Sequence, residues 1–465
     1  MNSVRHLLPA AAVLLGACAS VSPSGAPRVP GDAAAPGAAW TARVPGVTAA
    51  EPTAWLEQFD DASFRAAVRE AVAQNPDLRA AASRMRQARI RAVRDGAARL
   101  PEVSARAGAS QSGDREGGWN WGNDYQLSLD VSWEADVWGR VRDSAAASVA
   151  NARAAEADYA AARLSLAANA GKSWCNLREA EAQVNLAQQT VDTYRKGLGT
   201  VDRAFDKGVP GVTALDVRLA RSSLAAGESN LQARLRARDE AQRTLEALLG
   251  RYPSGRVETS GRLPGLRRTV PAGVPSSLLL RRPDILAAEQ RIAAARGRES
   301  AARKALLPSF NLSAGAGTGG ARLSDLFDER RLAATLLQSL TQPLYRGGAL
   351  RAEVQLTQEE REELVQRYAA AAVQAFREVE TAMAAETFIA RQIESQRTFV
   401  KESVESERLA FSEYEKGLQG QNGPGVLRLL EAQRRAFDSQ SGLLRLENQL
   451  LQARLDLCLA LGGGF

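Results

Sequence analysis

The chain has 465 residues, with 60 Lys and Arg against 53 Asp and Glu, one histidine, three cysteines and an aromatic content of 5%. The histidine is His6, close to the N-terminus, so the rest of the chain cannot build Ser-His-Asp or Cys-His catalysis or a His-ligated metal site. The cysteines are too few to replace it as a ligand set. We therefore predict a protein that is not an enzyme, with no catalytic residues, metal or cofactor.

Residues 1–17 are predicted to be a secretion signal. Arg5 supplies a positive start, and residues 7–16 form an apolar stretch too short to span a bilayer. Leu15-Gly16-Ala17 then precede Cys18, which resembles the bacterial lipoprotein signal, where the cysteine is lipidated and becomes the mature N-terminus. An ordinary secretion signal with an incidental cysteine is the alternative. We predict a covalent lipid on Cys18, and in the lipoprotein pattern Ala19 instead of Asp is associated with sorting to the outer membrane.

Residues 18–55 are predicted to be a tether. They are rich in Pro, Ala, Gly and Ser, a composition that cannot build a hydrophobic core. Removing Arg5 with the signal lowers the formal charge from +7 to +6. The remaining charges are interspersed, as in residues 359–363, without a dense basic stripe. We read them as solvated helix faces and predict no nucleic-acid partner.

An internal repeat organises the remaining chain. Three segments recur at a constant displacement of 207 positions: residues 75–78 and 282–285, 100–101 and 307–308, and 137–138 and 344–345. Two later segments recur at displacements of 209 and 212, namely 205–208 with 414–417 and 248–250 with 460–462. A fixed displacement over several landmarks predicts two structural units, residues 56–255 and 256–465. Each unit is expected to hold a helix, two strands and a long helical hairpin.

Two stretches in each unit alternate apolar and polar residues. In the first unit they run over 103–109 and 125–133, and in the second they begin at Phe310 and Leu332. Strands of about 10 residues with one apolar and one polar face are typical of membrane β-barrels. The alternative is a soluble sandwich edge or a hairpin. Tryptophan favours the barrel, because four of the seven tryptophans fall within residues 119–138. We expect membrane-interface girdles there, as barrels carry, from Trp119, Trp121, Tyr125, Trp133 and Trp138.

Four strands cannot close a barrel, and open edges are not tolerated in lipid. Subunits must therefore pool strands around a symmetry axis. Two chains would give eight strands, three would give twelve and an aqueous lumen, and symmetry alone also allows four chains.

Long helices follow each strand pair. Helical stretches are expected over about 139–206 and 347–416, each spanning on the order of 100 Å at 1.5 Å per residue. Returning helices are expected over about 213–249 and 426–461. Alanine-dense faces in these stretches permit close, coiled-coil packing. A filamentous coiled coil without a pore would leave the strands and the lipoprotein signal unexplained. Cys175 and Cys458 lie far apart within these helices and are expected to be buried free thiols.

Several segments in this order resemble the TolC-like outer-membrane efflux channels, in particular the NodT-like lipoprotein branch. The matching segments are the signal at Cys18 and residues 75–78, 136–140, 274–285, 432–434 and 461–464. The resemblance implies a trimer in which a twelve-stranded barrel continues into a twelve-helix periplasmic tunnel. It also implies a tripartite efflux system with a periplasmic adaptor and an inner-membrane pump of the resistance-nodulation-division type, exporting small toxic compounds or drugs across the bacterial outer membrane.

The family closes its tunnel at the hairpin tips with rings of aliphatic and charged residues. Mapped onto this chain, the gate positions are Asp216, Leu427, Glu431 and Arg434. Alternatively, Glu431 and Arg434 form only a solvated pair three residues apart, worth about 0.2–0.5 kcal/mol. Residues 418–425 are longer and richer in glycine than the family's turn, which shifts the expected register of the gate.

Two other functions fit parts of the sequence. A duct for one-step protein secretion would share the architecture, and neighbouring genes for a pump or for a protease-family transporter would separate it from efflux. A non-conducting structural lipoprotein would tolerate loss of Glu431 and Arg434 without any change in conductance.

Overall fold

The computed structural model describes residues 55–115, 119–257, 259, 263–266, 281–417 and 425–463. The predicted secretion signal, Cys18 and almost the whole predicted tether lie outside the described residues. So do residues 274–280 of the family-like segment and residues 418–424 of the second tip.

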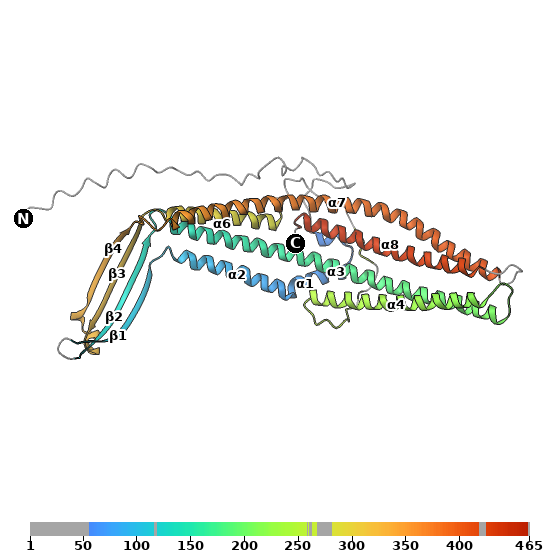
Figure 1. The fold of residues 1–465 in the computed structure, drawn as a ribbon, viewed down its shortest axis with the longest axis horizontal. Coiled ribbons are helices and arrows are strands. Elements are labelled where there is room, and N and C mark those ends of the chain that lie inside the picture. Colours follow the sequence, from blue (N-terminus) through green and yellow to red (C-terminus); the bar gives the residue numbers. More distant parts are fainter. Residues whose placement is uncertain are drawn as a thin grey trace, which may run out of the picture.

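Two helical hairpins account for most of the length of the molecule (Figure 1). Each pairs a very long helix with a shorter returning one, and the four are α3 (Arg140–Asp206), α4 (Ala214–Leu248), α7 (Ala349–Gly417) and α8 (Val426–Ala460). With 67 and 69 residues, α3 and α7 are each on the order of 100 Å long. The long and returning helices predicted from sequence are therefore present.

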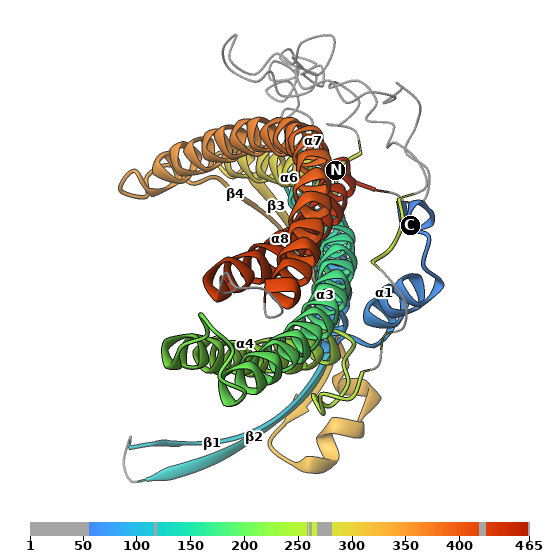
Figure 2. The same ribbon diagram turned by 90° about the vertical axis from the view of Figure 1, so that its right-hand side faces the viewer.

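Two shorter helices, α2 (Pro76–Ala97) and α6 (Pro283–Lys304), run from the middle of the molecule toward the sheet (Figure 1). A third, α1 (Ala62–Gln74), lies midway along the molecule beside α3. In Figure 1, α2 runs beside α3, and α6 beside α3 and α7. Figure 2 shows α4, α3, α8 and α7 arranged as an arc with one open side, which is the shape of a wall segment and not of a closed bundle. Within the described residues, no helix combines the length and apolar character needed to cross a membrane.

The ends of these helices have local causes. Asn75 caps α2, because its Oδ1 accepts hydrogen bonds from the backbone N–H groups of Asp77 and Leu78 at 2.9 and 3.1 Å. Its Nδ2 donates to the carbonyl oxygen of Leu248 at 3.0 Å, which ties the start of α2 to the end of α4. Asp136 accepts in the same way from the first N–H groups of α3, after the left-handed turn at Gly139.

One antiparallel sheet lies at the end of the molecule opposite the hairpin tips (Figure 1). Its strands follow the order β1-β2-β3-β4, with bounds Glu102–Asp114, Asn120–Ala135, Ser309–Gly320 and Ala333–Thr341. The register places Leu127 opposite Ala107 on one side and Thr318 on the other, so these side chains share a face. That face carries the odd-numbered apolar residues of β2, and the polar residues Gln126, Ser128 and Asp130 point to the other face.

The main hydrophobic core lies midway along the helices. There α1 and the short 3-10 helix Trp55–Gln58 pack against α3, α4, α7 and α8. The fully buried side chains in this cluster include Phe59, Phe64, Leu177, Leu245 and Leu455. Gly171 permits the close approach of Phe64, whose ring lies 3.0 Å from the position that a β-carbon would occupy. This packing fixes the two hairpins relative to each other at their base.

Candidate gate and membrane surface

The tips of the two hairpins are held together by a second hydrophobic cluster. It includes buried side chains from all four long helices: Val201, Val217, Ala220, Ala410, Tyr414, Val426 and Leu429. The four predicted gate residues belong to α4 and α8, the two helices that begin at this cluster. The packing of the first turns of α4 and α8 therefore determines whether the tip is closed or open.

Asp216 is built into the start of α4. Its carboxylate accepts hydrogen bonds from the backbone N–H and the hydroxyl of Thr213, at 2.8 and 2.7 Å. The Asp216 N–H lies 3.4 Å from the Thr213 oxygen, which completes a capping box. The side chain thus has a structural role at the tip.

Glu431 forms a cluster with two arginines on α8. Its carboxylate accepts from Arg434 at 3.0 Å and from Arg435 at 2.9 Å. Hydrogen bonds from Arg435 and then Arg434 hold the pKa of Glu431 below its ordinary value. The solvated pair of Glu431 with Arg434, three residues apart, is therefore present within this chain, and Arg435 adds a contact that was not predicted. The gate assignment itself stays a prediction.

Leu427 is the aliphatic member of the predicted gate. It lies in the first turn of α8, and 65% of its side chain is exposed. The neighbouring Val426 and Leu429 are buried in the tip cluster. Leu427 is thus the apolar residue of this turn that remains available to another surface.

Tyr414 is a tip residue in the repeated segment 414–417 and is not among the predicted gate positions. It is 2% exposed, and its hydroxyl has no hydrogen-bond partner among the described residues. Burial, assisted by the charge of Asp216, raises its pKa to about 12. Its repeat equivalent Phe205 is 43% exposed. The sequence signal for this site is the difference between the repeats, because Tyr414 carries a hydroxyl where Phe205 does not.

The predicted interface aromatics occupy both ends of the sheet. Trp119 and Trp121 lie at the far end, where their rings stack with centroids 5.6 Å apart. Trp121 and Tyr125 belong to the same face as Leu127, since their positions differ by even numbers along β2. This is the apolar face expected to meet lipid.

Trp133 and Trp138 lie at the near end of the sheet, beside the helices. The indole of Trp133 donates to the carbonyl oxygen of Arg99 at 3.0 Å, and that of Trp138 donates to Pro308 at 2.8 Å. Leu344 and Tyr345, the repeat equivalents of Val137 and Trp138, are almost fully exposed at the corresponding junction. This second pair is not among the interface residues predicted above, although the displacement of 207 leads to it from Val137 and Trp138.

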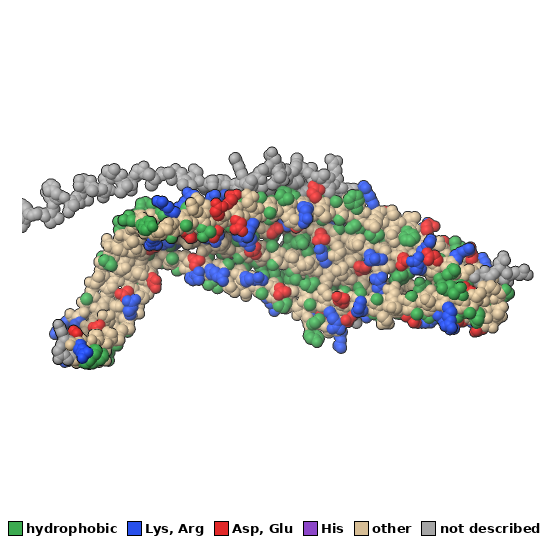
Figure 3. Space-filling view, in the orientation of Figure 1, with side chains coloured by type: hydrophobic (Ala, Val, Ile, Leu, Met, Phe, Trp, Pro, Cys, Tyr) green, Lys and Arg blue, Asp and Glu red, His purple; other side chains and the backbone are tan. Residues whose placement is uncertain are grey.

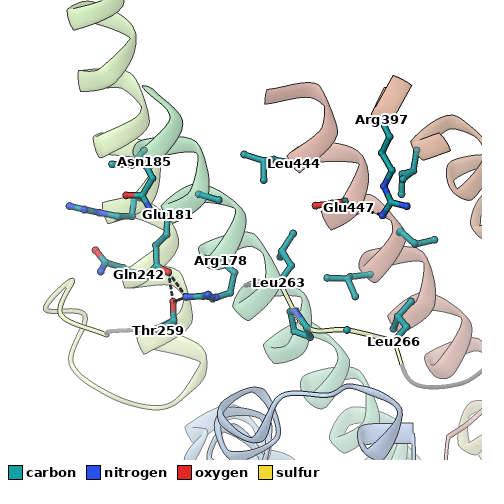
Figure 4. Close-up of a pocket in the computed structure, with 18 of the residues that line it drawn as sticks. Arg178, Glu181, Asn185, Gln242, Thr259, Leu263, Leu266, Arg397, Leu444 and Glu447 are labelled. Atoms are coloured by element: carbon teal, nitrogen blue, oxygen red, sulfur yellow. Dashed lines mark hydrogen bonds and ion pairs between the residues drawn. The ribbon is translucent and has the colours of Figure 1, made fainter. Parts of the chain in front are cut away.

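A cavity of about 1360 Å³ opens between α4 on one side and α7 and α8 on the other (Figure 4). On its α3 wall, Arg178 donates to Glu181 at 2.8 Å and to Thr259 at 2.9 Å. Across it lie Arg397 and Glu447, 3.8 Å apart. These charged side chains of the cavity are therefore paired with one another, and their contacts connect α3 with Thr259 and α7 with α8. Within the described ranges, no three His, Cys, Asp or Glu side chains are placed to hold a metal ion.

Comparison with known proteins gives a consistent result. The family model for outer membrane efflux protein matches the chain twice, over residues 67–251 and 274–463. The pyoverdine export outer membrane protein OpmQ of Pseudomonas putida is 33% identical over 404 residues, covering 84% of this chain and 83% of that protein. The cation efflux system protein CusC of Escherichia coli K12 is 28% identical over 409 residues, covering 87% and 88%.

Among solved structures, the open state of the MtrE outer membrane channel of Neisseria gonorrhoeae has a TM-score of 0.83. It is 26% identical, with 95% of this chain and 97% of that chain covered. The predicted fold class and two-fold repeat are confirmed.

Proposed function

The chain belongs to the outer membrane efflux protein family, and on that premise we propose that three copies form a gated export duct for small organic compounds. Its membership makes it an outer-membrane efflux channel, as predicted, in a family of channels and not of enzymes. Outer-membrane factors of this kind are trimeric and work with an adaptor and an inner-membrane pump. For this chain, we propose a periplasmic adaptor and a pump of the resistance-nodulation-division type.

The unclosed sheet is the observation that carries the proposal. β1 and β4 are its two edges, and each is paired on one side only within the described residues. Unpaired backbone groups cannot face hydrocarbon, so β4 of one copy must pair with β1 of the next. Three copies give twelve strands, enough for an aqueous lumen. The arc of helices in Figure 2 would then close into a tunnel around the same axis.

The gate is proposed at the hairpin tips. In a threefold assembly, Asp216, Leu427, Glu431 and Arg434 each occur three times around one axis. Like carboxylates brought close together repel unless countercharged, and Arg434 and Arg435 already neutralise Glu431 within each copy. Such a ring narrows the tunnel to a small leak while the pairs hold, and it widens when a partner protein pulls the helix starts apart.

Organic cargo is favoured over soft metal ions by the ligands that are available. Among the described residues, the methionines are Met85 and Met383, and Met383 is buried in the core. Cys175 and Cys458 are also buried. In the part of the chain that the structure describes, this leaves Met85 as the one sulfur side chain outside the core, which is too few for a relay of sulfur ligands along the lumen. Loss of the gene should sensitise cells to organic toxicants and leave tolerance to copper and silver unchanged.

The proposal also includes a lipid anchor at the N-terminus and the boundaries of the two repeats. Residues 1–17 are cleaved, Cys18 carries the lipid, and residues 18–55 link it to the folded part. Two repeats, 56–255 and 256–465, follow. Mass spectrometry of the mature N-terminus should show an acylated cysteine, and an unmodified N-terminus at another residue would contradict the anchor.

Light scattering of the detergent-solubilised protein tests the assembly. The mass of the protein component should equal three mature chains. A monomer that retains its helical circular dichroism would overturn the trimeric duct, because the sheet would then remain open.

A further inference from the structure

The loop between β3 and β4, residues 321–332, folds back onto the sheet. We call it the rim loop. Thr318 on β3 donates its hydroxyl hydrogen to the carbonyl oxygen of Leu326, at 2.6 Å. A β-carbon added at Gly320 would lie 2.7 Å from Cβ of Asp325, so the loop lies directly against the end of β3. The absence of a side chain at Gly320 permits this approach.

The register shows which face the rim loop covers. Thr318 is paired with Leu127, and Gly320 with Tyr125. Paired residues project from the same face of a sheet. The rim loop therefore lies over the apolar face, the one that meets lipid in a membrane barrel, and not over the polar face that lines the lumen.

Internal bonds give the rim loop a defined shape. The Arg322 N–H donates to the carboxylate of Asp325 at 3.1 Å, and the Arg330 N–H donates to Asp328 at 3.0 Å. Arg331 lies 3.7 Å from Asp325 and 3.8 Å from Asp328. Three arginines and three acidic residues balance within residues 321–332, so net charge does not set its partner. Its exposed surface nevertheless includes two large apolar side chains, because Leu323 and Phe327 are 61% and 80% exposed.

The strands beneath the rim loop lack interface aromatics of their own. At the far end, β2 carries Trp121 and Tyr125 and Trp119 directly precedes it, whereas β3 ends in Gly317-Thr318-Gly319-Gly320 and β4 begins with Ala333-Ala334. A girdle built from strand residues alone would therefore be interrupted over half of every copy. Figure 3 shows hydrophobic side chains beside charged ones at this end of the sheet.

We propose that the rim loop is a membrane-contacting element, which inserts Leu323 and Phe327 into the interfacial region of the outer leaflet and completes the girdle over β3 and β4. The partner is a lipid surface. This assignment rests on the proposed barrel, since the apolar face must meet lipid. The loop contacts β2 and β3, the central strands of the copy, so it does not occupy the edges where neighbouring copies would pair.

Site-directed fluorescence in vesicles tests the proposal. Phe327→Cys and Leu323→Cys proteins are labelled with an environment-sensitive fluorophore and reconstituted into phosphatidylcholine vesicles. Parallel samples contain phosphatidylcholine with a doxyl quencher either close to the glycerol or deep in the acyl chain. Cys175 and Cys458 should not react, because burial raises both thiol pKa values to about 12. The unsubstituted protein, taken through the same labelling, sets the background.

Two matched variants separate the outcomes. Leu129→Cys, on the lipid-facing side of β2, should be quenched by the deep quencher. Leu215→Cys at the hairpin tip is 65% exposed and should not respond to either quencher. The rim loop proposal predicts that labels at Leu323 and Phe327 lose fluorescence most strongly with the shallow quencher. If Leu129 is quenched and neither loop position is, the rim loop faces water and the inference is overturned. If Leu129 is also unquenched, the proposed barrel fails and the inference fails with it.

Discussion

Arg282 donates a hydrogen bond from its guanidinium to the carbonyl oxygen of Ala460, 3.1 Å away, at the last residue of α8. Asn75 occupies the equivalent place in the first repeat and donates to Leu248, the last residue of α4, at 3.0 Å. Each repeat therefore ties the start of its short helix to the end of its returning helix. Arg282 also pairs with Asp284 and Glu378, both at 2.7 Å. Arg282 is accordingly the centre of a structural clasp.

Arg282→Ala should destabilise the protein without altering selectivity. The substitution leaves the Ala460 carbonyl oxygen without this donor and removes the ion pairs to Asp284 and Glu378, which costs about 1–3 kcal/mol. We expect a lower thermal unfolding midpoint by circular dichroism. Arg298→Ala, an exposed arginine on the same helix, is the matched control and should leave the midpoint unchanged. Equal midpoints for both variants would show that the clasp carries no stability.

Tyr414→Phe should be neutral or stabilising. The substitution removes a buried hydroxyl that lacks a partner among the described residues, and an unsatisfied buried donor costs about 1–3 kcal/mol. Tyr414→Ala keeps neither ring nor hydroxyl and should cost about 3–5 kcal/mol through the cavity that it leaves. Thermal unfolding of both variants distinguishes the two contributions. A clear loss of stability in Tyr414→Phe would mean that the hydroxyl binds a group of a neighbouring copy.

The architecture was largely predictable from sequence, because it depends on periodicity. Alternation over 103–109 and 125–133 marked the strands that became β1 and β2, and the displacement of 207 located β3 and β4. A barrel strand must present one face to lipid and the other to water, so apolar and polar residues alternate along its sequence. Long amphipathic helices leave a similarly extended signal.

The structures of the tip and of the rim loop were less predictable from sequence, because they depend on individual contacts and not on a repeating pattern. The capping box at Thr213 and Asp216 could have been found from its spacing of three residues. By contrast, Arg434 and Arg435 both suit Glu431 by spacing, and only the folded helix shows that both bind it. The rim loop has no periodicity, so its position over the apolar face emerges from the register between Gly320 and Tyr125.

Acid should weaken the gate only at pH values below the ordinary pKa of a glutamate side chain. Hydrogen bonds from Arg435 and Arg434 lower the pKa of Glu431 from 4.5, so the carboxylate stays charged and paired above that value. A depressed carboxyl pKa gives a contribution that is present above 4.5 and is lost as the pH falls through the folded-state value. Ion leak through resting channels should therefore stay flat from pH 7 to about pH 5 and rise at lower pH. A leak that rises between pH 7 and pH 6 would assign the gate to another group, and Glu431→Gln should abolish the acid response.

Current through single channels in a planar lipid bilayer tests the central claim most directly. The unsubstituted protein should give discrete, small conductance steps at neutral pH. The double substitution Glu431→Gln with Arg434→Ala should give larger or longer openings, because the ring loses its paired charges. Glu405→Gln, which breaks an exposed glutamate–arginine pair of the same spacing on α7, should behave like the unsubstituted protein. Larger conductance in the double variant alone is the predicted result. Absence of any channel current from correctly assembled trimers would contradict the account of a gated efflux duct.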